Sequence, residues 1–100
     1  MIEYNEPNTT EKQTVERLLI NDILKELVRA RIKFPGKNAT FAALVEEVGE
    51  VATALMEEPA SNVRKEALQV AVMAIRLILD GDQTMDSWRD YKNLDKLVNV

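Results

Sequence analysis

The chain of 100 residues contains no cysteine and no histidine. Without cysteine it cannot form disulfides or use a thiol nucleophile, and the usual zinc sites are excluded. Without histidine it cannot build a Ser-His-Asp triad or use imidazole as a base. If the chain is an enzyme, its chemistry depends on carboxylates, Lys, Arg, Tyr, Ser or Thr, and on metals that take oxygen ligands.

Glycine and proline are also scarce, with three of each, and they separate segments of helical periodicity. The boundaries lie at FPGKN (residues 34–38), at Pro59 and at DGD (residues 80–82). The sequence has no strand-like alternation and no internal repeat. We therefore expect one all-α domain over residues 1–100, with helices at about residues 10–32, 39–57, 61–80 and 86–98.

Long apolar runs and a basic surface are both missing. The longest apolar run, residues 70–75, is far below the roughly 20 residues that a membrane helix needs. The net charge of −4 argues against a nucleic-acid polymer as partner, because such a partner requires a clustered basic face. These features predict a cytoplasmic protein that binds neither membrane nor nucleic acid, although a metal ion could still offset the charge of a phosphorylated ligand.

The second half of the third expected helix, VAVMAIRLIL (residues 70–79), is apolar nearly all round. Such a helix must be covered on most sides, and the rest of a chain this short offers limited cover. We therefore expect a four-helix bundle completed by oligomerisation, as a homodimer or tetramer.

Three carboxylates, Glu46, Glu47 and Glu50, crowd the middle of the second expected helix. Glu47 and Glu50 lie on a different face from the apolar stripe formed by Phe41, Leu44, Val45, Val48, Ala52 and Leu55. Glu66 and Gln69 have the same spacing of three on the next helix. On antiparallel helices the two pairs can face each other and supply oxygen ligands to Mg²⁺. The alternative is a set of solvated glutamates on exposed helix positions.

The segments LVEEVGEVATAL and EALQVAVMAI resemble the MazG-like all-α nucleoside triphosphate pyrophosphohydrolases, whose signature is ExxE, a spacer and ExxD. The resemblance covers roughly residues 30–80, and residues 1–9 and 83–100 are peripheral to it. It implies a Mg²⁺-dependent enzyme, with Mn²⁺ as a substitute, that hydrolyses (d)NTPs to the monophosphate and pyrophosphate. Glu47, Glu50 and Glu66 match the metal ligands. The homo-oligomer expected above agrees with the resemblance.

The fourth ligand position departs from this signature, because Gln69 stands where the family has Asp. A neutral amide oxygen is a weaker ligand for a hard cation than a carboxylate. Three explanations remain open. Another group, such as Glu46, supplies the missing carboxylate; the number of metal ions or their affinity differs from that of the family; or the activity has decayed. The last makes the chain a helical interaction or oligomerisation protein. An enzyme like phosphoribosyl-ATP pyrophosphohydrolase, which shares the fold, is a further alternative.

Four further residues are candidates for catalysis or substrate binding. Glu46 is the candidate to orient the attacking water. Arg76 lies inside an apolar run on the Glu66 stripe. It either contacts substrate phosphate or orients an acidic ligand, or else it extends out of the bundle to solvent or pairs with a Glu across a dimer interface. Lys33 and Lys37 flank FPG and either reach a triphosphate or belong to a solvated basic loop.

Overall fold

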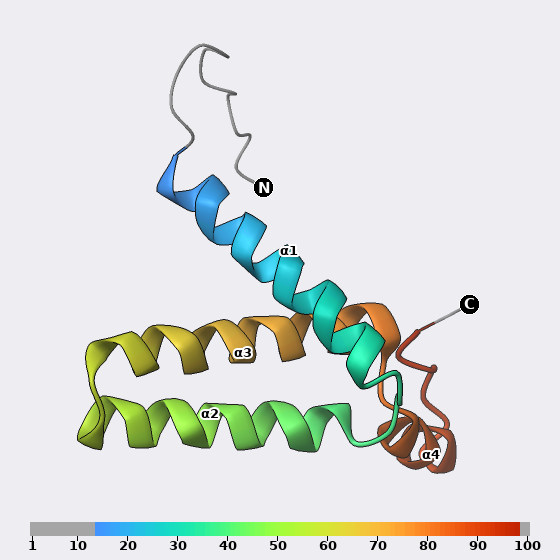
Figure 1. Ribbon diagram of the computed structural model, residues 1–100. Helices are drawn as coiled ribbons and strands as arrows, with labels where there is room; N and C mark the ends of the chain where they lie inside the picture. Colours follow the sequence, from blue (N-terminus) through green and yellow to red (C-terminus); the bar gives the residue numbers. More distant parts are fainter. Residues whose placement is uncertain (1–13, 99–100) are drawn as a thin grey trace.

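The computed structural model describes residues 14–98, and within this part the chain forms four helices and no strand (Figure 1). The helices are α1 (Val15–Lys33), α2 (Thr40–Glu57), α3 (Ala60–Asp80) and α4 (Gln83–Tyr91). For the described residues the prediction of an all-α chain is therefore confirmed. None of these helices combines the length and the apolar character that crossing a membrane requires.

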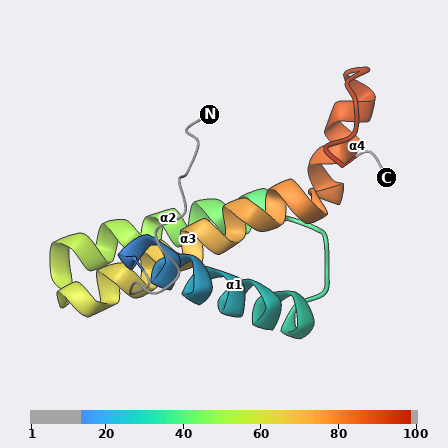
Figure 2. The ribbon, with the colours of Figure 1, turned by 90° about the horizontal axis from the view of Figure 1, so that it is seen from above.

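Helices α2 and α3 form an antiparallel hairpin, and α1 crosses α3 at an angle (Figures 1 and 2). The short α4 continues beyond the C-terminal end of α3 (Figure 2). The residues that pack α1 against α3 are Leu27, Ala30 and Val72, with Ile23, Leu68 and Ile75 beside them. The fully buried Ala54 belongs to α2, which packs closely on α3.

Two helices, α1 and α4, have ends that differ from those predicted by more than one residue. Residues 10–13, where the first helix was expected to begin, lie outside the described residues. Thr14 is extended, and its hydroxyl accepts a hydrogen bond from the N–H of Arg17, so α1 begins at Val15. The prediction of a helix over residues 86–98 is wrong at both ends. Asp82 caps α4 before Gln83, and the chain leaves the helix at Lys92 ahead of Asn93, which has a positive φ of 58°.

The apolar stripe of α2 is largely exposed in the protomer. The exposed fractions of Phe41, Val45 and Val48 are close to one half, and Leu55 is 67% exposed. Helix α2 instead packs on α3 through a face that includes Glu47 and Ala54. On α3, residues 70–77 are buried or half-buried in the protomer, and exposure within this apolar half is confined to the last turn, where Ile78 is 74% and Leu79 46% exposed.

Candidate metal centre and adjoining pocket

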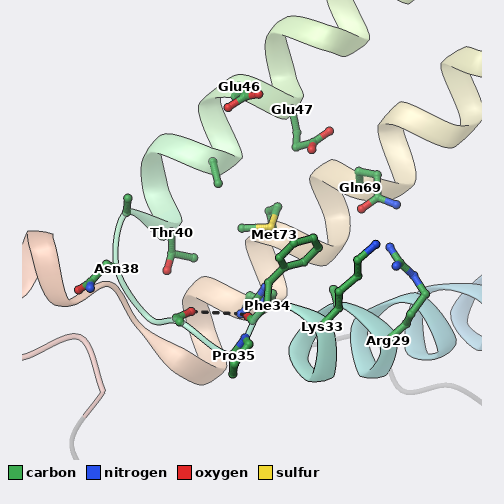
Figure 3. Close-up of a pocket in the computed structure, with 15 residues that line it drawn as sticks. Arg29, Lys33, Phe34, Pro35, Asn38, Thr40, Glu46, Glu47, Gln69 and Met73 are labelled. Carbon is green, nitrogen blue, oxygen red and sulfur yellow. Dashed lines mark hydrogen bonds between the residues drawn. The ribbon is translucent and has the colours of Figure 1, made fainter.

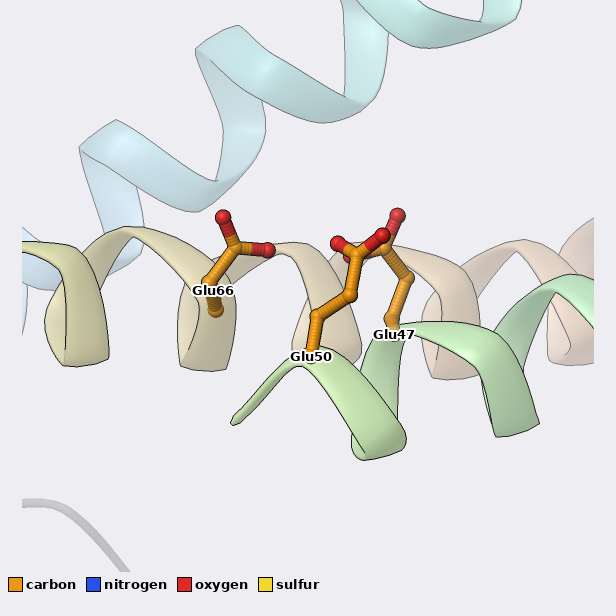
Figure 4. Close-up of side chains that lie close together, drawn as sticks. All are labelled: Glu47, Glu50 and Glu66. Atoms are coloured by element: carbon orange, nitrogen blue, oxygen red, sulfur yellow. The ribbon is translucent and has the colours of Figure 1, made fainter. Parts of the chain in front are cut away.

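Glu47 and Glu50 of α2 face Glu66 of α3 across the hairpin (Figure 4). One carboxylate oxygen from each residue lies within 4.8 Å of the others. The spacing of three places Glu47 and Glu50 on adjacent turns of one face, and the antiparallel packing brings Glu66 opposite them. The structure thus brings together three of the four predicted metal ligands.

The electrostatics of this cluster disfavour three bare carboxylates. Burial, together with the nearby charges of Glu66 and Glu46, raises the pKa of Glu47 above its ordinary value, although Glu50 acts in the opposite direction. The carboxyl group of Glu50 raises the pKa of Glu66, and partial desolvation adds to this effect. Oε2 of Glu47 is buried and has no hydrogen-bond partner. A proton or a cation is needed to offset this concentration of negative charge.

The donor set fits a hard divalent cation. Carboxylate oxygens are the ligands that Mg²⁺ and Mn²⁺ prefer, and the partnerless Oε2 of Glu47 offers a buried acceptor at the cluster. Zn²⁺ in its usual protein sites prefers sulfur or imidazole ligands, which this chain lacks.

A pocket of about 750 Å³ adjoins the cluster and shares Glu47 with it (Figure 3). The C-terminal part of α1, the connection over residues 34–39, the start of α2 and the middle of α3 form its walls. Arg29 and Lys33 from α1 supply positive charge, and Glu46, Glu47 and Gln69 line the other walls. The apolar lining comes from Ala30, Phe34, Pro35, Ala43 and Met73. The pocket thus combines cationic groups, an apolar surface and the edge of the acidic cluster.

Buried charges fix the connection that forms one wall of the pocket. Arg76, only 6% exposed, donates to the carbonyl oxygens of Phe34 at 2.6 Å and Gly36 at 3.3 Å. Asp80 lies 3.6 Å from Nε of Arg76. At the other end, the backbone N–H of Gln83 donates to the carbonyl of Lys37 at 2.9 Å. The wall is therefore tied to α3 and to the start of α4.

The start of α2 is capped from a distant part of the chain. The N-cap residue is Ala39, with a left-handed φ of 59°, and no side chain of the cap itself accepts the first N–H groups of the helix. The carboxylate of Asp82 accepts the N–H groups of Ala39 and Phe41 instead. Local spacing cannot predict such a cap, because its donors and its acceptor are more than 40 positions apart in sequence.

Comparison with protein-family models, with curated proteins and with solved structures gave no match. The assignment of a function therefore depends on the site itself.

The remaining predicted site residues take different positions. Glu46 and Glu47 both line the pocket, and Glu47 reaches toward α3 (Figure 3). Gln69 lines the pocket, and its amide nitrogen donates to Glu26 of α1 at 3.1 Å. Lys33 lines the pocket, with its ammonium 5.4 Å from the centre of the Phe34 ring. Lys37 is exposed and contributes a backbone carbonyl to the anchoring of the connection.

Arg29 and Glu26, two residues close to Gln69, were not predicted as site residues. With Lys33 they lie three and four residues apart, a spacing that places all three on one face of α1. This spacing could have identified them, but nothing in the sequence indicated that this face lies next to Gln69. The hydrogen bond to Arg29 holds the pKa of Glu26 below its ordinary value, so Glu26 is an ionised acceptor at neutral pH.

Proposed function

We propose that this chain is a Mg²⁺-dependent nucleoside triphosphate pyrophosphohydrolase of the MazG-like type, which converts a (d)NTP to the (d)NMP and pyrophosphate. The observation that carries the proposal is the Glu47–Glu50–Glu66 cluster, with its partnerless buried oxygen, at the edge of a pocket with cationic walls. A triphosphate needs both features, because its reacting end requires a divalent cation and its remaining charge requires basic groups.

In this proposal Glu47, Glu50 and Glu66 hold the cation, and Gln69 adds a neutral oxygen. When bound, Mg²⁺ offsets the negative charge that develops on the phosphate oxygens. Arg29 and Lys33 lie on the opposite wall and neutralise the rest of the phosphate chain. Glu46, exposed at the pocket, would accept a proton from the attacking water, whose oxygen bonds to the α-phosphorus as the bond to the leaving pyrophosphate breaks.

The apolar part of the same pocket is suited to the nucleoside. Phe34, Pro35 and Met73 offer flat or adaptable apolar surface, and Asn38 and Thr40 offer hydrogen-bonding groups. Phe34 is 56% exposed, which leaves part of its ring accessible to a base. The pocket volume of about 750 Å³ lies within the usual range of small-molecule sites.

The working unit in this proposal is a homo-oligomer. The exposed stripe of α2 and the outward face of α1 together place many large apolar side chains at the protomer surface, among them Val15, Leu18, Ile20, Leu24, Val28, Ile32, Val45, Val48 and Leu55. An apolar surface of this extent is typical of protein interfaces. Symmetric pairing of protomers would cover it.

The test is pyrophosphate release from a panel of NTPs and dNTPs, with Mg²⁺, with Mn²⁺ and with EDTA. We expect metal-dependent release, lost in Glu47→Gln and Glu50→Gln. Glu57→Gln is the matched control, because Glu57 is an exposed glutamate of the same helix outside the cluster. Release that persists in EDTA or in both cluster variants would refute the proposal.

A second candidate function is a helical interaction protein that retains the acidic cluster without turnover. The observation in its favour is the hydrogen bond that ties the Gln69 amide to Glu26. Binding of Mg²⁺ without pyrophosphate release from any nucleotide of the panel would support this function.

A further inference from the structure

Gln69 links α3 to a charged pair on α1. Its Nε2 donates to Oε1 of Glu26 at 3.1 Å. Nε of Arg29 donates to both carboxylate oxygens of Glu26 at 3.0 Å each. The side chain of Glu26 is only 18% exposed, whereas that of Arg29 is 54% exposed. Arg29 thus fixes the Glu26 carboxylate, and the carboxylate in turn fixes one end of the Gln69 amide.

This contact determines which way the amide points. An ionised carboxylate only accepts hydrogen bonds, so the nitrogen of the amide must face Glu26. The carbonyl oxygen is then the atom that Gln69 can offer on its other side. Gln69 follows Glu66 by three residues on α3 and lines the pocket together with Glu47 (Figure 3).

Orientation matters for an amide in a way that it does not for a carboxylate. Both ends of a carboxylate are oxygens, so either end can bind a cation. An amide has one oxygen and one NH₂ group, and a half-turn about its last bond presents a donor to the cation. A glutamine that serves as a metal ligand therefore needs a partner that fixes its nitrogen.

We propose that Glu26 is a positioning residue of the metal centre, which holds the Gln69 amide so that its oxygen is presented to the cation. This rests on the proposed function, because it requires a divalent cation at the Glu47–Glu50–Glu66 cluster. Outer partners of metal ligands act in the same way elsewhere, where they fix the orientation of the ligand that they contact. Glu26 itself does not contact the cation.

The experiment is calorimetric titration of Mg²⁺ into the nucleotide-free protein. Glu26→Met removes the acceptor but keeps a good helix former of similar length. We expect it to weaken Mg²⁺ binding about tenfold, the lower end of the effect known for such outer partners. Glu26→Gln keeps an oxygen that can accept from Gln69, so it should retain most of the affinity. The double variant Glu26→Met with Gln69→Ala should bind no more weakly than Gln69→Ala alone.

The Gln69→Asp background separates orientation from charge. The new carboxylate needs no orienting partner and cannot donate to Glu26. In that background, Glu26→Met should therefore leave Mg²⁺ affinity nearly unchanged, because a carboxylate binds the cation through either oxygen. If Glu26→Met instead weakens binding equally in both backgrounds, Glu26 acts through its charge and the proposal is overturned.

A matched control tests whether Glu26 only docks α1 on α3. Asp22 of α1 accepts from Arg64 of α3 at 2.9 Å, and neither residue lines the pocket. Asp22→Asn should leave Mg²⁺ affinity unchanged, and thermal unfolding without metal reports the folding of each variant. Equal losses of affinity in Asp22→Asn and Glu26→Met would overturn the positioning role. A wild-type protein that binds no Mg²⁺ would instead refute the proposed function, and the positioning role with it.

Discussion

Oδ2 of Asp82 accepts a hydrogen bond from the backbone N–H of Phe41 at 2.8 Å, across 41 positions of sequence. Oδ1 of the same side chain accepts from Ala39, Thr84 and Met85. Asp82 is 1% exposed. One buried carboxylate therefore completes the N-termini of both α2 and α4, and it fixes the end of the connection that lines the pocket.

Asp82→Asn should destabilise the protein by about 2–3 kcal/mol, because its amide nitrogen would face the N–H of Phe41 or one of the other three donors. Urea unfolding at pH 7 measures the loss. Asp86→Asn is the control. Asp86 accepts a single, more exposed hydrogen bond from Leu97, so its substitution should cost about 1 kcal/mol or less. Equal costs would mean that the double cap contributes little.

The contribution of Asp82 should also depend on pH. Burial acts to raise the pKa of Asp82, but four backbone N–H groups outweigh it and hold the pKa below its ordinary value of 3.8. A depressed carboxyl pKa stabilises the fold above the unfolded value, and this stability is lost as pH falls through the folded value. The stability difference between wild type and Asp82→Asn should therefore be constant above about pH 5 and shrink below about pH 3.8.

In metal-free protein, Glu47→Gln should change the pH dependence of stability in the opposite direction to Asp82→Asn. Because the pKa of Glu47 is raised on folding, its ionised form disfavours the folded state, and stability falls as pH rises through the folded pKa. The variant should thus melt at a higher temperature than wild type at pH 7, with the difference vanishing below about pH 4.5. At pH 7, saturating Mg²⁺ should reverse the order of the two melting temperatures. The cation binds the wild type more tightly than the variant and therefore stabilises it more. A variant that melts below wild type without metal at pH 7 would contradict the electrostatic account of the cluster.

Arg76→Lys should loosen the pocket wall. A single ammonium cannot reproduce the guanidinium that reaches the carbonyls of Phe34 and Gly36 and approaches Asp80. We expect a loss of about 2 kcal/mol in unfolding free energy and, for the proposed enzyme, a raised KM. Arg31→Lys is the control, because Arg31 is bonded to the same Asp80 at 2.7 Å but is exposed. It should cost about 0.5 kcal/mol or less.

Sedimentation of the purified protein tests the exposed apolar stripe of α2. Wild type should sediment at micromolar concentration as a dimer or larger assembly, and Val45→Lys should shift it toward the protomer by placing a charge in the interface. Glu57→Lys, on the polar side of the same helix, should leave the assembly intact. A wild-type protein that sediments as a folded and active protomer would rule out the proposed assembly.

The sequence predicted those features that depend on local spacing. The ends of α2 and α3 lie within one residue of the predicted positions, because Gly81 and the connections at residues 34–38 and 58–59 interrupt the periodicity. The spacing also predicts that Glu47 and Glu50 lie opposite Glu66 when the two helices form a hairpin.

Features that depend on the relative placement of α1, α3 and α4 were not predictable in this way. Nothing in the local pattern places Glu26 beside Gln69 or Asp82 beside Phe41, because these contacts join segments more than 40 positions apart. The role of Arg76 at the connection was missed for the same reason. Helix α2 packs on α3 through the face that includes Ala54, because a small side chain lets α3 approach more closely than the larger apolar residues of the exposed stripe do.

The capping of α2 by Asp82 affects the order in which parts of the chain can fold. During synthesis α2 leaves the ribosome well before Asp82, so its first N–H groups must wait for an acceptor that is added later. The wall of the pocket therefore cannot adopt its final shape on the nascent hairpin alone. Closing this contact requires a loop of about 40 residues, which is slow compared with helix formation, so this wall of the pocket forms after the helices that it joins.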